Sequence, residues 1–310
     1  MKVGILTFHS ADNYGAVLQA CALAQVLRSL GHDARVIDYA PAYISEPYKL
    51  WKKGWWKHPV GIVKNLCNSS NAACRARGFE EFRRGMQLMP YPPEGLDAVF
   101  FGSDQIWNQA LTGGDTVWFA DAPVFDKTRN IAYGASCGST PIPEGIDFGR
   151  FHRISVREPQ LQKVLEGRGV ESTLVLDPVL LAGKEIMAEM AAPCTVEGEF
   201  VFEYEALDDA NVMNAAEEIG LPVVRVARSI RSEGGKRFSP GEFIALIMNA
   251  NTVVSNSFHA IALAILFGKK YRFIPFGSGK DERVNNIISI AENLDALRKE
   301  SLQFIEESLI

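Results

Sequence analysis

The stretch KVGILTFHSADNYGAVLQACALAQVLRSLGHDARVIDY, residues 2–39, decides the expected fold. Its opening apolar run, residues 3–6, predicts a buried strand that ends in a polar loop. From Ala16, apolar residues recur at intervals of three and four until Gly31, which predicts a helix that stops at a glycine. Residues 33–39 predict a second strand. A strand, a helix and a strand in this order form a βαβ unit, so the two strands should be parallel and covered by helices.

Short apolar runs that end in polar or glycine-bearing loops recur along the rest of the chain. They predict two sets of strands, at residues 98–101, 130–133, 153–156 and 172–176, and at residues 199–204, 222–226, 252–254 and 271–274. At 310 residues the chain exceeds the usual size of one hydrophobic core. We therefore expect an α/β protein of two Rossmann-like lobes with parallel sheets.

The predicted boundary divides an N-terminal lobe, residues 1–185, from a C-terminal lobe, residues 186–310, which carries a terminal helix. Residues 41–90 interrupt the rhythm of strands and helices with tryptophans among lysines. We interpret them as a basic helical excursion from the first lobe.

The composition is that of a globular protein, with 47% hydrophobic and 22% charged residues. No apolar run reaches the length of a membrane span, and Met1 leads directly into strand-like sequence, so we expect a cytoplasmic protein. Its five cysteines are widely spaced and include no C-x-x-C pair, which favours reduced thiols over a zinc site.

The net charge of −5 argues against nucleic acid as a partner, but the charge is unevenly spread. Residues 49–84 hold five lysines and four arginines against two glutamates, a balance of +7 that leaves −12 elsewhere. Two interpretations stay open. A cationic amphipathic helix can rest peripherally on the inner face of an anionic membrane, or the same residues can form a solvated face with the tryptophans packed inward.

Ligands of parallel sheets bind beyond the carboxyl ends of the strands, so the loops there hold the candidate site residues. Asn13, before the first helix, can help bind an anion or merely cap that helix. Asp104 can act as a general base or as a cap. Arg157 can bind a carboxylate or phosphate, or pair with Glu158 at the surface. His259, in the first turn of a predicted helix, can be a general acid or a structural histidine.

Neither the dinucleotide fingerprint G-x-G-x-x-G nor a P-loop occurs, which disfavours NAD and ATP. Taken in order, the polar motifs instead resemble the polysaccharide pyruvyl transferase family across nearly the whole chain. The motifs are Thr7-Phe8-His9, Asn13–Gln19, Gly102–Asn108, Val156-Arg157-Glu158, Asp177-Pro178, Ser239–Phe243 and Ser257-Phe258-His259.

The resemblance implies an architecture like that of the GT-B glycosyltransferases. It also implies transfer of the enolpyruvyl group of phosphoenolpyruvate, as a ketal, to two hydroxyls of a sugar in a polysaccharide or exopolysaccharide precursor. The partners would be phosphoenolpyruvate and a sugar or lipid-linked glycan, with no nucleic acid. No metal or other cofactor is implied, because phosphoenolpyruvate is the donor substrate.

The resemblance places the acceptor on the N-terminal lobe and the donor on the C-terminal lobe. The implied catalytic residues are His259 and Asp104; the donor-binding residues are Arg157, Ser257 and Arg283; the acceptor-binding residues are His9, Asn13, Tyr14 and Gln105.

The chain departs from the family at one position that concerns the donor. Members with the best-understood donor sites carry Arg-Leu-His where this sequence has Ser257-Phe258-His259. Losing a charge-assisted contact removes about 1.5 to 3 kcal/mol of binding energy unless another cation, Arg283 or Arg228, substitutes. Two alternatives therefore stay open: a GT-B-like glycosyltransferase that uses a nucleotide sugar, and a non-catalytic member of a glycan-assembly complex.

Overall fold

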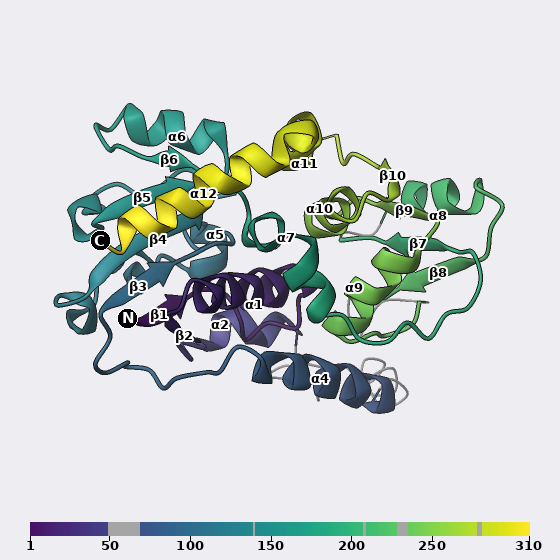
Figure 1. The fold of residues 1–310 in the computed structure, drawn as a ribbon, viewed down its shortest axis with the longest axis horizontal. Helices are drawn as coiled ribbons and strands as arrows, with labels where there is room; N and C mark the ends of the chain where they lie inside the picture. The colour runs from purple at the N-terminus through teal and green to yellow at the C-terminus, as the bar shows by residue number, and fades with distance from the viewer. Residues whose placement is uncertain (49–68, 139, 207–208, 228–234, 278–280) are drawn as a thin grey trace, which may run out of the picture.

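Two parallel sheets form the framework of the protein (Figure 1). The computed structural model describes residues 1–48, 69–138, 140–206, 209–227, 235–277 and 281–310. The first sheet has the order β2-β1-β3-β4-β5-β6 and consists of β1 (Lys2–Leu6), β2 (Asp33–Val36), β3 (Ala98–Phe101), β4 (Arg129–Ala135), β5 (Arg153–Val156) and β6 (Thr173–Leu174). The second has the order β10-β9-β7-β8 and consists of β7 (Val201–Tyr204), β8 (Val223–Val226), β9 (Thr252–Ser255) and β10 (Lys270–Phe273).

All neighbouring strands pair in parallel, which confirms the prediction of two Rossmann-like lobes. The helices are α1 (Tyr14–Ser29), α2 (Ala42–Ser45), α4 (Ser69–Arg84), α5 (Gln109–Thr112), α6 (Pro159–Glu166), α7 (Pro178–Glu189), α8 (Ala210–Glu217), α9 (Pro240–Asn249), α10 (Phe258–Leu266), α11 (Glu282–Ile290) and α12 (Leu294–Ser308). Short 3₁₀ turns lie at Glu46–Tyr48, Thr116–Phe119, Pro123–Phe125, Phe148–Arg150 and Ala291–Asn293.

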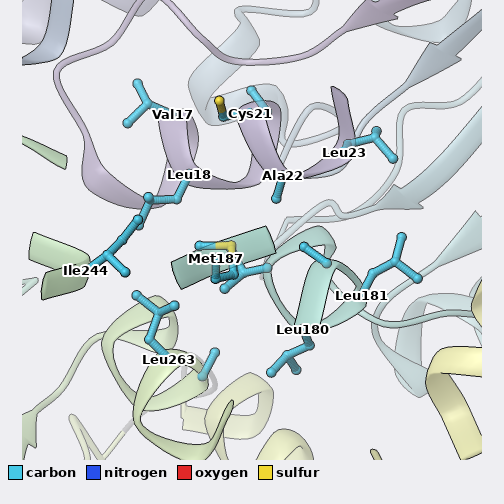
Figure 2. Packing of buried hydrophobic residues seen from close by; sticks show 14 of the residues in the cluster. Val17, Leu18, Cys21, Ala22, Leu23, Leu180, Leu181, Met187, Ile244 and Leu263 are labelled. Atoms are coloured by element: carbon cyan, nitrogen blue, oxygen red, sulfur yellow. The ribbon is translucent and has the colours of Figure 1, made fainter. Parts of the chain in front are cut away.

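The two lobes share one apolar core. Helices α1 and α7 pack against α9 and α10, and Figure 2 shows Leu18, Leu180, Ile244 and Leu263, one from each helix, around the same interior. Since burial of a leucine or isoleucine side chain stabilises the fold by about 1.5 to 3 kcal/mol, this shared interior holds the lobes together.

Tyr14, at the start of α1, belongs to the same contact between lobes. Its ring is 1% exposed and stacks on Phe243 of α9, with 4.3 Å between the ring centroids. Its hydroxyl donates a hydrogen bond of 2.7 Å to the carbonyl of Phe238.

The chain crosses between the lobes at α7 and returns with its last helix. Helix α12 lies against the first sheet (Figure 1), where Ser301 accepts a hydrogen bond from the amide of Leu176 and Glu307 pairs with Arg153. The predicted lobe boundary between residues 185 and 186 lies within α7, and it stays a prediction.

Helix α4 is the longest described element of the basic excursion, and two of its arginines point into the protein. Arg83 donates to the carbonyls of His9 and Ala11 and pairs with Asp12 at 2.6 Å. Arg75 is 2% exposed and donates to the Tyr14 hydroxyl and to carbonyls on either side of the contact between lobes, those of Asp12 and Ala227. These cations therefore brace the loop after β1.

Residues 49–68, which carry the tryptophans of the predicted membrane-binding segment, lie outside the described residues. In the part of the chain that is described, no helix combines the length and the apolar character needed to cross a bilayer. Peripheral membrane contact through residues 49–84 stays a prediction.

Replacing Arg75 with alanine should lower the free energy of unfolding by about 2 to 4 kcal/mol, because three acceptors lose a charged donor in a buried place. Urea unfolding would measure the change. Arg77→Ala, on the exposed side of the same helix, is the matched control and should change the free energy by less than about 0.5 kcal/mol. Equal effects of the two substitutions would contradict the bracing role.

Candidate active site

A cavity of about 830 Å³ lies where the carboxyl ends of both sheets face each other. From the first lobe, Gln105 and Asn108 after β3 and Glu158 after β5 line it. From the second lobe, Asn256 and Phe258 line it after β9, which lies beside β7 where the strand order of that sheet reverses. Parallel sheets bind ligands at this kind of position, and the volume is within the usual range of ligand sites, about 300 to 1,000 Å³.

Beside the cavity, a buried carboxylate meets an arginine of the first lobe and a histidine of the second. Asp177 caps α7 by accepting a hydrogen bond of 2.9 Å from the amide of Val179. Its other oxygen accepts a hydrogen bond from Nη1 of Arg157, which directly follows β5. Nε2 of His259, in the first turn of α10, lies 3.7 Å from that same oxygen, a distance of an electrostatic contact rather than a hydrogen bond.

The charges of this cluster explain how a carboxylate can stay ionised when its side chain is only 1% exposed. Burial by itself would raise the pKa of Asp177, but the neighbouring His259 and Arg157 hold that pKa well below its usual range. The cluster thus brings polar side chains of both lobes together beside the apolar core.

The imidazole of His259 lies against the backbone of Gly15, at the start of α1. A Cβ at that position would overlap the ring atoms of His259, so only glycine leaves room for it. Nε2 of His259 is buried and has no hydrogen-bond partner among the described residues. The histidine is therefore held in place by packing while one ring nitrogen keeps its hydrogen-bonding capacity.

Two arginines approach the ring of Phe258 at the edge of the cavity. The guanidinium carbon of Arg157 lies 5.5 Å from the ring centroid, and that of Arg283, in the first turn of α11, lies 5.9 Å from it. Burial and the positive charge of Arg157 lower the pKa of Arg283. Within the described residues, the Arg283 guanidinium makes neither a hydrogen bond nor an ion pair. This corner can bind an anion.

Residues 13–275 match the family described as polysaccharide pyruvyl transferase. The chain belongs to this family. It is therefore a transferase, and its two-lobed fold is described above. No curated protein matches the transferase sequence.

Solved structures of sugar-modifying enzymes are similar to the transferase along nearly its whole length. UDP-GlcNAc 2-epimerase from Neisseria meningitidis has 12% identity and a TM-score of 0.47, covering 100% of this chain and 99% of its own. UDP-N-acetylglucosamine 2-epimerase from Rickettsia bellii has 12% identity and a TM-score of 0.45, and the match covers 99% of this chain and 96% of its own. ADP-heptose lps heptosyltransferase II from E. coli has 10% identity and a TM-score of 0.39, and the match covers 97% of this chain and 99% of its own. These likenesses carry no argument about activity.

The transferase brings several predicted site residues together and keeps others apart. Of the residues predicted to bind the acceptor, Gln105 lines the large cavity. His9 is 1% exposed and contacts Asp38 and the carbonyl of Thr7. Asn13 caps α1, and Tyr14 is the buried interlobe residue described above. Their predicted ligand-binding roles stay predictions.

Among the other predicted residues, Arg157, Arg283 and His259 gather beside Phe258 and Asp177. Ser257 caps α10 with its hydroxyl, which accepts from the amide of Ala260. The side chain of Asp104 accepts a hydrogen bond from the amide of Gln105.

The sequence interpretation missed two residues of the site, Asp177 and Glu158. The Asp177-Pro178 pair favoured a tight turn after a strand, and nothing local indicated that its carboxylate would meet Arg157 and His259. The surface pairing considered for Arg157 and Glu158 is wrong, because these residues are only 7% and 9% exposed. Their position directly after a buried strand was the one signal that could have indicated burial.

Replacing Asp177 with asparagine should cost about 3 to 5 kcal/mol of stability at pH 7, because Arg157 would lose its buried counter-ion. The folded-state pKa lies below the unfolded value of about 3.9, so the ionised carboxylate stabilises the protein above that pH and its contribution is lost as the pH falls below it. Urea unfolding at pH 7, 4 and 3 should therefore show that the difference in free energy of unfolding between wild type and Asp177→Asn becomes smaller as the pH falls.

The control for that experiment is Asp33→Asn, which removes an exposed pair with Arg35. An exposed pair contributes at most about 1 kcal/mol. If Asp177→Asn lowers the free energy of unfolding by the same amount at all three pH values, the charge-based explanation is refuted.

Replacing Gly15 with alanine should displace the imidazole of His259, because the new Cβ would occupy the space of the ring. Nuclear magnetic resonance of the histidine side chains would detect the displacement as shifted ring resonances, and transferase activity should fall with it. Gly167→Ala, at the end of α6, places its Cβ at ordinary contact distance. This control should leave the histidine resonances and the transferase activity unchanged. Unshifted His259 resonances in Gly15→Ala would contradict the packing described here.

Proposed function

We propose that the transferase moves the enolpyruvyl group of phosphoenolpyruvate onto two hydroxyls of one sugar in a glycan precursor, as a cyclic ketal. The observation that carries the proposal is the cationic corner beside Phe258. There Arg283 makes neither a hydrogen bond nor an ion pair among the described residues, although it lies over the Phe258 ring. Arg157, hydrogen-bonded through Nη1 to Asp177, has two further guanidinium nitrogens, Nε and Nη2, without hydrogen bonds.

A bound dianion or trianion would relieve the repulsion between the two arginines. Phosphoenolpyruvate carries a carboxylate and a phosphate, and the planar guanidinium binds both kinds of group in bidentate fashion. In this proposal Arg283 supplies the positive charge that the family places at position 257, where this chain has a helix-capping serine.

His259 is the proposed acid that protonates the methylene carbon of the donor. Its Nε2 has no hydrogen-bond partner within the described residues and lies 3.7 Å from the carboxylate of Asp177. A ring nitrogen without a partner can carry the proton that a general acid donates. Protonation makes the adjacent carbon of the enol electrophilic, so that a sugar hydroxyl can add to it.

The large cavity is the proposed acceptor site. The side chains of Gln105 and Asn108 offer amide groups for sugar hydroxyls, while Phe258 and Phe276 offer apolar surface for the carbon face of a ring. The cavity is large enough to hold a sugar beside the small donor.

Incubation of the protein with phosphoenolpyruvate and a panel of lipid-linked and nucleotide sugars should release phosphate and yield a pyruvylated sugar detectable by mass spectrometry. Arg283→Ala should weaken phosphoenolpyruvate binding about 10- to 150-fold, because a charge-assisted contact is worth about 1.5 to 3 kcal/mol. His259→Ala should abolish phosphate release.

Arg272→Ala, which removes an exposed arginine paired with Glu218, is the control and should leave binding and turnover unchanged. Undiminished phosphate release by His259→Ala would refute the assigned acid. Thermal stabilisation by UDP or GDP, with none by phosphoenolpyruvate, would instead favour a glycosyltransferase that uses a nucleotide sugar.

A further inference from the structure

The local structure around Glu158 does not explain why its carboxyl group is buried. It is the N-cap residue of α6, where a side chain usually accepts a hydrogen bond from the helix, yet the Glu158 side chain makes no such bond. The residue is 9% exposed. A buried carboxylate that serves neither as a cap nor in a short ion pair needs another explanation.

The hydrogen bonds of Glu158 leave one oxygen available. Oε1 accepts a hydrogen bond of 2.9 Å from the hydroxyl of Ser136, and Nη2 of Arg157 lies 3.9 Å from that same oxygen, too far for a hydrogen bond. Oε2 is buried and has no hydrogen-bond partner in the described part of the chain.

Glu158 lies between the proposed donor corner and the proposed acceptor site. It lines the cavity of about 830 Å³, and it also lines a smaller pocket of about 20 Å³ together with Arg157, Phe258 and Arg283. A group that borders both spaces can reach an acceptor hydroxyl as that hydroxyl approaches the donor.

Asp104, the base implied by the family resemblance, lies less favourably. Asp104 lies close enough to Arg157 and Arg283 to interact with them electrostatically. However, one of its carboxylate oxygens accepts a hydrogen bond from the amide of Gln105, and Asp104 is not among the described residues that line the large cavity, as Glu158 is. The comparison of these two carboxylates favours Glu158 as the base.

We propose that Glu158 takes the proton from the attacking sugar hydroxyl, an inference that rests on the proposed function. As the hydroxyl oxygen bonds to the central carbon of the donor, its proton moves to the Glu158 carboxylate. The bond from that carbon to the phosphate oxygen then breaks, and the second hydroxyl closes the ketal and loses its own proton. The donor methylene gains one hydrogen from His259. The proton held by Glu158 passes to the departing phosphate, which returns Glu158 to its carboxylate form, and the proton of the second hydroxyl restores His259.

The charges around Glu158 suit a base that works near neutral pH. Burial raises the pKa of Glu158, the positive charges of Arg157 and Arg283 and the Ser136 hydrogen bond oppose that rise, and Asp177 adds to it. Cys137 also lies close enough to interact electrostatically with the carboxylate. The net result is a pKa above the usual value of a glutamate, nearer the pH at which a general base is most effective.

The test is the pH dependence of acceptor-dependent phosphate release, measured with phosphoenolpyruvate binding by calorimetry in parallel. Glu158 must be deprotonated to act, so the wild-type rate should rise with pH through the Glu158 pKa. Glu158→Gln should lower kcat about 10²- to 10⁴-fold and remove this rise, with phosphoenolpyruvate affinity changed less than about threefold. Ser136→Ala removes a hydrogen bond that favours the ionised form, so it should move the rise to higher pH.

Glu166→Gln, at an exposed site on α6, is the matched control and should retain the wild-type profile. Three results would overturn the inference: a Glu158→Gln enzyme with the wild-type pH profile, loss of the rise in Asp104→Asn but not in Glu158→Gln, or an unmoved rise in Ser136→Ala. The last result decides the question even if Glu158→Gln fails to fold. Failure of the proposed function would look different, because wild-type protein would then neither bind phosphoenolpyruvate nor release phosphate from it.

Discussion

The buried carboxylate of Asp177 is the interaction on which the arrangement of the site depends. An ionised group in a protein interior is stable only when cations or hydrogen-bond donors surround it, and Asp177 obtains these from three directions. The amide of Val179 belongs to α7, Arg157 to the first lobe and His259 to the second. Because Arg157 and His259 come from different lobes, the same carboxylate orders a donor of the first lobe and a candidate acid of the second. Displacement of the second lobe would remove the contact with His259 and leave Asp177 with Arg157 and the Val179 amide.

The relation between His259 and Gly15 adds a steric constraint to this electrostatic one. A glycine before a helix is often interpreted as room for a phosphate, and the sequence of this chain allowed that interpretation. The structure uses the room for an imidazole instead. The start of α1 therefore supports the imidazole on the side of Nδ1 and Cε1, while Nε2 faces Asp177. The candidate acid depends on the contact between lobes for its position.

The strands and the first helix were predictable because their signals are local. Apolar runs bounded by polar loops predict buried strands, and Asn13 with Gly31 marks the limits of α1. The partners of buried polar groups could not be predicted, since those partners are distant in sequence. His9 contacts Asp38, and the Tyr14 hydroxyl contacts the carbonyl of Phe238, so both polar groups are satisfied within the protein. The basic character of residues 49–84 was visible, but nothing in it indicated that Arg75 and Arg83 would be used internally.

The break in α7 has a mechanical consequence. At Gly183 the backbone leaves the helical conformation, with a φ of 77°, and Arg298 of α12 donates hydrogen bonds to the carbonyls of Leu181 and Ala182 on the N-terminal side of the break. The two segments by which the chain passes between lobes are thus fastened to each other at one place. Any relative movement of the two lobes would therefore have to carry α7 and α12 together at this point.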